Sequence, residues 1–523
     1  MKLNIQNTFS KKLPADAILE NSRRQVSKAA YSFVIPKKTK NAQLIHVSNE
    51  MLAAIGLNQE DLKSEEFLNI FTGNKVYPNT QPYAMCYGGH QFGNWAGQLG
   101  DGRAINLFEI SHNNKLWAVQ LKGAGETPYS RSADGLAVLR SSVREHLCSE
   151  AMFHLGIPTT RSLSLSLSGD EVLRDVMYNG NPEYEEGAIV CRLAPSFIRF
   201  GSFEILAANK DIDTLKTLTN YTIKHFYPEI TSEGKQKYLD LLTIVQDRTI
   251  DLIINWQRVG FVHGVMNTDN MSILGLTIDF GPYGWLEGFD SNFTPNTTDN
   301  QHKRYRYGNQ GFIGMWNMYK LANALYDLIG DVKPLQKILD KYENIYDKKH
   351  QEMMLSKLGL SFLTQGEISI NLIAELENTL ELIETDFTIF YRNLASILKG
   401  DSPETCLSKI SDAFYTKNDL NTVVKNEWIA WFQKYLDILN NDDTSDQERK
   451  LKMNSVNPKY ILRNYIAQLA IDEANKGDYK LINDLYELLK NPYSEQLEHE
   501  KWFAKRPEWA RNKIGCSKLS CSS

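Results

Sequence analysis

Residues 263–281, HGVMNTDNMSILGLTIDFG, decide how the fold of this chain is interpreted. The first half is a polar loop that carries His263, Asp269 and Asn270, and the stretch ends with Asp279 in an Asp-Phe-Gly triplet. Amide and carboxylate oxygens are the ligands that Mg²⁺ prefers, and Mn²⁺ accepts the same ligands. The stretch therefore predicts a divalent-cation site in which Asn270 and Asp279 are the metal ligands.

Two short apolar runs, residues 271–274 and 276–278, lie between this loop and the final Asp, on either side of Gly275. The pattern predicts a short β-hairpin. A loop Asn and a D-F-G Asp on either side of a hairpin are typical of protein-kinase-like folds. Kinases place the base Asp two residues after the loop His, whereas this chain has Val265 there, and valine cannot accept a proton. We therefore expect that the site does not deprotonate a hydroxyl in the usual kinase manner.

Composition is ordinary for a globular protein. The chain length predicts two to four domain-sized units. Hydrophobic residues make up 42% of the chain and charged residues 23%, which indicates no large disordered fraction. The formal net charge of −5 gives no overall attraction to nucleic acid or to an anionic membrane. There is no long apolar run and no signal-peptide pattern, so we expect a cytoplasmic protein with no nucleic-acid and no membrane partner.

The six cysteines are scattered over the chain. They form no disulfide framework and no zinc spacing.

Residues 83–103, YAMCYGGHQFGNWAGQLGDGR, hold six glycines within fifteen residues. Such density favours close approach of the backbone to a ligand, and a bulged, turn-rich sheet is the alternative. Residues 103–122 then predict two strands joined by a polar turn. Because a strand that ends in A-V-Q-L-K after a Gly-rich segment has the order of a kinase N-lobe, Lys122 is a candidate phosphate ligand.

An amphipathic helix is predicted after this strand. Glu145 lies on it, at the place where a kinase would have the Glu that pairs with the strand Lys. Glu150 is the other candidate for pairing with Lys122, and for either residue the alternative is a charged side chain on the surface without a functional role. Asp134 and Gly135 stand just before the helix, and helix N-termini bind anions.

Two arginines, Arg192 and Arg199, lie seven residues apart within apolar sequence. Arginines in such surroundings need partners, and the guanidinium suits bidentate contact with phosphate. A pair of buried bridges from arginine to carboxylate is the alternative.

Helical periodicity dominates the rest of the chain, from residue 205 to 259 and again beyond 311. The polar residues 281–310 take the place of an activation segment, and NPKYILRNY at 457–465 is interpreted as a helix cap followed by a core helix, with basic contacts as the alternative. We expect an α+β, protein-kinase-like two-lobed fold with a β-rich N-lobe, a helical C-lobe and additional C-terminal helices. The expected units are an N-terminal extension (1–82), an N-lobe (83–204), a helical C-lobe (205–400), a C-terminal helical region (401–510) and a flexible, cysteine-containing tail (511–523).

These residues resemble the selenoprotein O family, protein adenylyltransferases with a pseudokinase fold. The resemblance covers residues 83–290 and returns in NPKYILRNY and in the C-terminal CSS, and the chain looks like a bacterial, cysteine-containing member. Long motifs carry it: GGHQFGNWAGQLGDGRA, QLKGAGETPYSR, DGLAVLRSSVREHL and HGVMNTDNMSILGLTIDFGP.

The resemblance implies that ATP binds in a flipped orientation and that AMP passes to Ser, Thr or Tyr hydroxyls of proteins while pyrophosphate leaves. It implies that Asp269 is the general base, that Asn270 and Asp279 hold Mg²⁺, with Mn²⁺ tolerated, and that Glu145 positions Lys122. The residues that it implies in ATP contact are Gly100, Gly102, Arg103, Lys122, Asp134, Gly135, Arg192, Arg199 and Asp279.

The family also carries a redox-active residue third from the C-terminus, which Cys521 matches and which implies redox partners. Some bacterial members join it to a cysteine of the activation segment. Residues 280–310 contain no cysteine here, and the matching place falls near Pro295, so that disulfide is not expected. A disulfide between Cys516 and Cys521 is the substitute hypothesis. We expect both thiols of the polar tail to be exposed, and an inert role for them is the alternative.

AMP transfer from ATP is thus the leading expectation from sequence. The alternatives are UMP transfer from UTP with manganese, phosphoryl transfer by a conventional kinase in which Asp269 is a displaced base, and a catalytically inactive nucleotide-binding scaffold. Retention of Lys122, Glu145, Asn270 and Asp279 argues against the scaffold, because a scaffold need not keep a complete set of metal and phosphate ligands.

Overall fold

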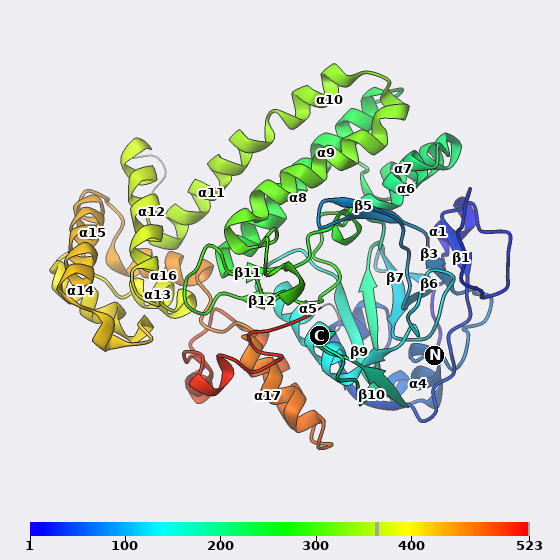
Figure 1. Cartoon of the computed structure of the whole chain (residues 1–523), viewed down its shortest axis with the longest axis horizontal. Helices are drawn as coiled ribbons and strands as arrows, with labels where there is room; N and C mark the ends of the chain where they lie inside the picture. Colours follow the sequence, from blue (N-terminus) through cyan, green and yellow to red (C-terminus); the bar gives the residue numbers. More distant parts are fainter. Residues whose placement is uncertain (361–365, 521–523) are drawn as a thin grey trace.

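The computed structural model describes residues 1–360 and 366–520 of the chain. Within these residues an eight-stranded antiparallel sheet has the order β1-β3-β6-β7-β10-β9-β2, and β8 pairs with β10 (Figure 1). Its strands are β1 (Tyr31–Phe33), β2 (Gln43–Val47), β3 (Tyr83–Met85), β6 (Ala104–His112), β7 (Lys115–Lys122), β8 (Ala137–Val138), β9 (Arg161–Arg174) and β10 (Glu183–Ala194). Two small two-stranded sheets are formed, one by the hairpin of β4 (Gly88–Gln91) and β5 (Asn94–Gln98), the other by β11 (Phe261–Val262) and β12 (Gly284–Trp285), which lie on either side of the polar loop in the sequence.

Both faces of this sheet are buried, which explains why its central strands are almost continuously apolar. On one face the helices α2 (Asn49–Ala54), α3 (Gln59–Leu62) and α4 (Glu65–Phe71) contribute to a core shared with β6 and β7. On the other face α5 (Leu139–His154) packs against β9 and β10. The two edge strands β1 and β2 precede residue 83, so the expected N-terminal extension contributes strands to the same sheet as the expected N-lobe. The boundary at residue 83 stays a prediction.

Helices make up most of the rest of the chain. Figure 1 shows α8 to α11 above the sheet-bearing part, α12 to α16 at the far left, and α17 below. Helices α17 and α18 return to pack on α5, so the expected C-terminal region is divided between two places. The bounds are α1 (Thr8–Lys12), α6 (Phe200–Ala208), α7 (Ile212–Phe226), α8 (Gln236–Val259), α9 (Gln310–Ile329), α10 (Val332–Leu339), α11 (Tyr342–Leu358), α12 (Gly366–Glu381), α13 (Phe387–Leu394), α14 (Pro403–Ile410), α15 (Thr422–Asn440), α16 (Asp446–Val456), α17 (Asn464–Ala474) and α18 (Lys480–Leu489).

The hairpin expected between residues 271 and 278 is not formed. Ser272 instead makes an isolated antiparallel bridge to Arg199, and Thr277 makes a parallel bridge to Thr159. The two runs are short, so each gains more from pairing with a neighbouring segment of the core than from a two-stranded hairpin alone. The two runs still connect the polar loop, which precedes them, to Asp279, which follows them.

Arg463 bears on both interpretations of NPKYILRNY. Its buried guanidinium donates to both carboxylate oxygens of Asp386, at 2.8 and 2.9 Å, and also pairs with Glu287. It stands directly before α17, so a core helix follows the run as predicted, but the Arg463 side chain makes no capping hydrogen bond. These contacts join α17 to the segment after β12.

Replacing Arg463 with Gln should lower the free energy of unfolding by about 3–5 kcal/mol, because two buried carboxylates lose their cation. Denaturant and thermal unfolding of the purified variant measure this. Arg511→Gln is the matched control, because it breaks a more exposed pair with Glu384. For that control we expect a loss of roughly 1 kcal/mol or less. Equal destabilisation by the two changes would contradict a core role for Arg463.

The described part of the C-terminal tail contacts the body of the protein, and its flexibility stays a prediction. Leu519 is fully buried, and its backbone pairs with the segment at Pro295 and Thr297. The position near Pro295 that sequence reasoning singled out thus lies beside the tail. Among the described residues, no helix is both long enough and apolar enough to pass through a membrane.

Candidate active site

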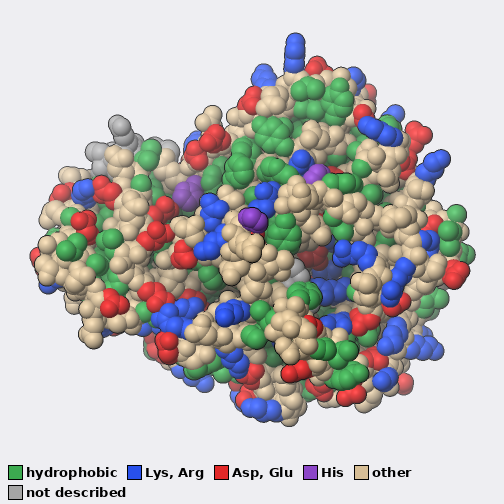
Figure 2. Space-filling view, in the orientation of Figure 1, with side chains coloured by type: hydrophobic (Ala, Val, Ile, Leu, Met, Phe, Trp, Pro, Cys, Tyr) green, Lys and Arg blue, Asp and Glu red, His purple; other side chains and the backbone are tan. Residues whose placement is uncertain are grey.

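A cavity of about 770 Å³ lies between the sheet and the loop that precedes Asp279. Figure 2 shows Lys and Arg side chains gathered around a hollow near the centre of the face in view. Sequence reasoning named twelve residues for catalysis, nucleotide or metal binding, and ten of them line this cavity: Gly100, Gly102, Arg103, Lys122, Asp134, Gly135, Arg192, Asp269, Asn270 and Asp279. The other two, Glu145 and Arg199, lie directly behind it and contact residues that line it.

A continuous chain of ion pairs crosses the back of the cavity. Lys122, at the end of β7, pairs with Glu145 of α5, and the other oxygen of Glu145 accepts from Arg192 at 2.9 Å. Arg192 in turn donates to one oxygen of Asp279 at 2.8 Å, and Arg199 donates to the other at 2.5 Å. The cations therefore stand beside the cavity with their geometry already fixed, which favours binding of a phosphate.

Burial and charge together set the ionisation of this network. Burial raises the pKa of Asp279, but Arg199, Arg192 and Lys122 outweigh it and hold that pKa well below its usual range. The pKa of Glu145 is likewise lowered, because Lys122 and Arg192 outweigh the effect of burial. Asp279 also has a left-handed backbone, with φ of 56°. A strained residue of this kind persists only where its surroundings fix it, and such residues concentrate at functional sites.

The choice between Glu145 and Glu150 is settled by the phase of α5. Five residues of α-helix correspond to a rotation of roughly 140°, so the two side chains point to different sides. Glu150 faces away from the cavity, where Arg161 donates to both of its oxygens at 2.8 and 2.7 Å. Glu145 is therefore the partner of Lys122.

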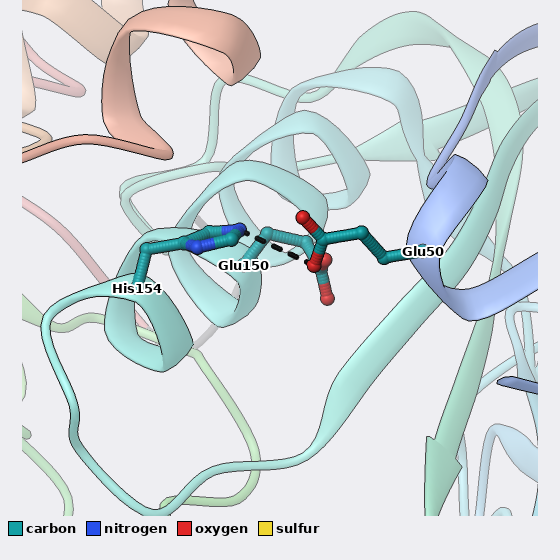
Figure 3. Close-up of side chains that lie close together, drawn as sticks. All are labelled: Glu50, Glu150 and His154. Atoms are coloured by element: carbon teal, nitrogen blue, oxygen red, sulfur yellow. Dashed lines mark ion pairs between the residues drawn. The ribbon is translucent and has the colours of Figure 1, made fainter.

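A second group of possible metal ligands surrounds Glu150. Figure 3 shows His154 and Glu50 reaching toward it, and ligand atoms of the three residues lie within 4.8 Å of one another. Arg161 pairs with Glu50 and Glu150 and already supplies the positive charge. This cluster therefore joins α2, α5 and β9, and it does not fit a cation.

Asp269 projects into the cavity from a single 3-10 turn, Thr268–Asn270. Burial raises its pKa to about 7, although a hydrogen bond from Gln91 and the charge of Arg199 oppose this. Gln91 donates to Oδ2 at 3.1 Å, and Oδ1 is buried without a hydrogen-bond partner among the described residues. A carboxylate with a pKa near neutrality and a free oxygen is suited to accept a proton.

The side chain of Asn270 is oriented by Val265, the residue that breaks the kinase pattern. Its side-chain amide donates to the carbonyl oxygen of Val265 at 2.9 Å, and its own oxygen has no donor among the described residues. His263 binds the carbonyl of Ile278 at 2.9 Å and thereby fixes the loop against the segment that leads to Asp279. Asn270 and Asp279 thus present an amide and a carboxylate oxygen to one cavity, and these oxygen atoms fit a hard divalent cation.

The Gly-rich segment approaches other parts of the protein closely. A Cβ atom added at Gly89 would lie 2.9 Å from Cβ of Asp269, and one at Gly100 would lie 2.3 Å from the ring of Tyr129. The pairing of β4 with β5 shifts register after Gly88, as the alternative of a bulged sheet predicts. Close approach to a ligand at Gly100 and Gly102 stays a prediction.

Asp134 and Gly135 lie at the rim of the cavity, and two features specify their conformation. Arg174 binds the Asp134 carboxylate at 2.7 and 2.8 Å. Gly135 has a left-handed backbone, and a Cβ atom there would lie only 2.1 Å from the carbonyl oxygen of Gly125, so only glycine fits. They precede β8 rather than a helix, because α5 begins four residues later at Leu139. The expected helix N-terminus is therefore not at Asp134.

The expected exposure of the tail thiols is wrong for Cys516. This residue is a free thiol that is 4% exposed, and burial raises its pKa to about 11. A buried, protonated thiol reacts slowly. Cys521 lies outside the described residues, so its redox role and a disulfide with Cys516 stay predictions.

Sequence reasoning missed two residues that support the site. Gln91 is the side chain that donates to Asp269. Asp101 is buried, accepts from the backbone of Met85 at 3.0 Å and lies 3.9 Å from Arg199. Both occur inside the quoted motif GGHQFGNWAGQLGDGRA, but no spacing rule relates that motif to a loop so much later in the chain.

Lys122→Met should raise the KM for ATP about 10- to 100-fold, because a charge-assisted contact with phosphate contributes roughly 1.5–3 kcal/mol. Glu145 keeps Arg192 as its partner, so the fold should survive. Lys115→Met, at the exposed start of the same strand, is the control and should leave KM unchanged. Steady-state kinetics check both, and an unchanged KM for Lys122→Met would remove this residue from the nucleotide site.

Clustered cations, a candidate proton acceptor and two oxygen ligands around one cavity define an enzyme that acts on the phosphate groups of a nucleotide. The family described as protein adenylyltransferase SelO matches residues 16–490 of this chain. The chain therefore belongs to the SelO family of nucleotidyltransferases, as the sequence resemblance indicates.

The similarity to individual relatives covers the full chain. A protein nucleotidyltransferase YdiU of Flavobacterium johnsoniae is 60% identical over 521 residues, covering 100% of this chain and 99% of the relative. Proteins with the same name from Rhodopirellula baltica and Aromatoleum aromaticum are 50% and 48% identical, again over 100% of this chain and 99% of each relative.

Proposed function

We propose that this chain transfers AMP from ATP to Ser, Thr or Tyr hydroxyls of proteins, with ATP bound in the flipped orientation and pyrophosphate as the leaving group. The sheet and α5 act as the N-lobe of a kinase-like fold, and α6 to α9 act as its C-lobe. The observation that carries the proposal is the position of Asp269. It is the carboxylate with a raised pKa and a free oxygen, and it stands beside the metal ligand Asn270.

The distribution of charge supports the flipped orientation. Lys122 and Arg192 lie beside the inner part of the cavity, and Arg103 lines it without an ion pair to any described residue. A terminal phosphate in this position balances these cations, which places the α-phosphate nearer to Asp269. A conventional kinase needs a base at the position of Val265 to deprotonate the hydroxyl that attacks the γ-phosphate. In the flipped orientation no base is needed at that position.

Asn270 and Asp279 would hold Mg²⁺ or Mn²⁺, which neutralises phosphate charge and draws electron density from the α-phosphorus. Asp269 accepts the proton of the attacking hydroxyl through Oδ1 while Gln91 holds Oδ2. Arg192 and Arg199 fix both oxygens of Asp279. Glu145 keeps Lys122 directed at the cavity.

Incubation of the enzyme and a protein acceptor with ATP labelled separately at the α- and γ-phosphates tests the proposal. Label should reach protein from the α position only, and a chelator should abolish it. Transfer from γ alone would establish a kinase, and no transfer from either would establish a scaffold. Repeating the assay with UTP and Mn²⁺ identifies the donor.

A further inference from the structure

One face of α9 is unusually aromatic for an exposed helix surface. Phe312 is 55% exposed. Trp316 and Lys320 follow at four-residue intervals, so the three side chains lie along one stripe. Trp95, at the tip of the hairpin β4–β5, is 41% exposed. His90 bridges the two elements, because its ring centroid lies 5.1 Å from that of Trp95 and 5.4 Å from that of Trp316.

The same region is strongly basic although the whole chain is acidic. Residues 300–326 contain four Lys and Arg and neither Asp nor Glu, whereas the formal net charge of the protein is −5. None of these four cations forms an ion pair within the part of the chain that the structure describes. They are Lys303, Arg304, Arg306 and Lys320.

Arg304 and Lys320 flank the indole of Trp316. The guanidinium carbon of Arg304 and Nζ of Lys320 each lie 4.6 Å from its centroid. Nε and Nη2 of Arg304 are buried and have no hydrogen-bond partner among the described residues, so no direct contact of these atoms neutralises the charge of the guanidinium. Nearby carboxylates are committed elsewhere: Glu204 binds His90 at 2.5 Å, and Asp299 accepts from the backbone of Arg304 and Tyr305.

The β4–β5 hairpin connects this surface to the wall of the active-site cavity. A Cβ atom added at Gly93 would lie 3.5 Å from the guanidinium carbon of Arg304, and the preceding residue, Phe92, lines the cavity. The ring of Tyr305 lies 5.3 Å from Phe92, which lines the cavity, and its hydroxyl donates to Asn267 at 2.6 Å. Asn317 of α9 donates to the carbonyl of Met266 in the same loop at 3.0 Å. Because Gln91 of the same hairpin donates to Asp269, a polypeptide docked on this surface would lie near that carboxylate.

We propose that the α9 surface, consisting of Trp95, Arg304, Phe312, Trp316 and Lys320, docks an acidic segment of the protein substrate next to the modified hydroxyl. The inference rests on the proposed function and names its class of substrate. Carboxylates of the substrate pair with the charges of Arg304 and Lys320, and apolar side chains cover Phe312 and Trp316. Charge complementarity of this type steers association and provides specificity.

Binding tests the inference without requiring transfer. Three fluorescein-labelled peptides each contain one Ser, one Thr and one Tyr beside four Glu, four Gln or four Lys residues, and their Kd values are measured by fluorescence anisotropy. The Glu peptide should bind at least about 10-fold more tightly than the Lys peptide at 50 mM NaCl. Because the contacts are partly exposed, the difference should shrink to roughly threefold or less at 500 mM NaCl.

Two double variants separate charge from folding. Arg304→Gln with Lys320→Gln should remove the preference for the Glu peptide. Arg304→Glu with Lys320→Glu should reverse it in favour of the Lys peptide, a result that a damaged fold does not produce. The matched control, Lys425→Glu with Lys450→Glu on α15 and α16, makes the same change in net charge at exposed positions and should retain the preference. The KM for ATP should stay within about twofold in all three variants.

Equal binding of the Glu and Lys peptides to the wild-type protein would overturn the inference, as would a preference that survives charge reversal. Binding of a single-stranded oligonucleotide of twelve nucleotides is measured as a further test. If it binds more tightly than the Glu peptide and loses binding in the same variants, the surface binds nucleic acid and the inference is wrong. Failure of the proposed function is distinct, because it appears as absence of α-label transfer while peptide binding is unaffected.

Discussion

Asp279→Asn should reduce transfer of AMP by about 10³-fold or more, which corresponds to roughly 4 kcal/mol of transition-state stabilisation. The change preserves the shape of the side chain but removes the charge that would hold the cation. It also leaves Arg192 and Arg199 with a neutral partner in a buried position. Transfer of α-labelled AMP, measured at saturating ATP and metal, gives the magnitude.

A loss of folding would imitate this effect, so the variant needs two controls. Thermal unfolding establishes that the protein is folded at the assay temperature. Asp290→Asn makes the same chemical change at an exposed position eleven residues later and should retain wild-type activity. If Asp279→Asn labels protein at the wild-type rate, Asp279 is not a metal ligand and the proposed site is wrong.

Asp269→Asn should lower kcat by about 10²–10⁴-fold with little change in the KM for ATP, because only the proton acceptor is lost. Asparagine keeps an oxygen that can accept from Gln91, so the loop should keep its position. The separation of kcat from KM is the useful measurement. A comparable rise in KM would indicate that Asp269 binds the nucleotide and is not the base.

The pH dependence of the wild-type enzyme provides a second measurement on Asp269. A base must be deprotonated to act, and burial raises the pKa of this carboxyl to about 7 in the free protein. The value of kcat/KM should therefore be constant above that pH and should fall about tenfold per unit below it. An ordinary Asp would lose activity only near pH 4, and such a profile would contradict the role of Asp269.

Residues close in sequence, or related by a fixed period, could be placed from the sequence alone. The strand that ends at Lys122, the helix that carries Glu145 and the loop with Asp269 and Asn270 follow from hydrophobic period and motif order, because these patterns report local backbone geometry. Of the twelve site residues that the sequence named, ten line one cavity in the structure.

Choices that depend on packing at a distance could not be made in this way. The sequence left Glu145 and Glu150 as rivals, and the rotation of α5 assigned them to Lys122 and Arg161. It left phosphate and carboxylate as alternatives for Arg192, and the structure places this guanidinium against Asp279 while it still lines the cavity.

The errors have the same origin. The prediction of a short hairpin after Asn270 was wrong because each run pairs with a distant segment. The prediction that Cys516 is exposed was wrong because the tail packs against other elements. Gln91 could not be found, since only folding brings β4 to the loop.

The sequence by itself determined the family, the order of strands, helices and loop, and the types of group available for phosphate, metal and proton. The tertiary structure decided which of these groups meet and which oxygen of Asp269 stays free. It also decided that the basic residues after 300 form a surface together with Trp95 and α9. Local backbone geometry depends on neighbouring residues, whereas burial, ion pairing and a raised pKa depend on contacts between segments far apart in the chain.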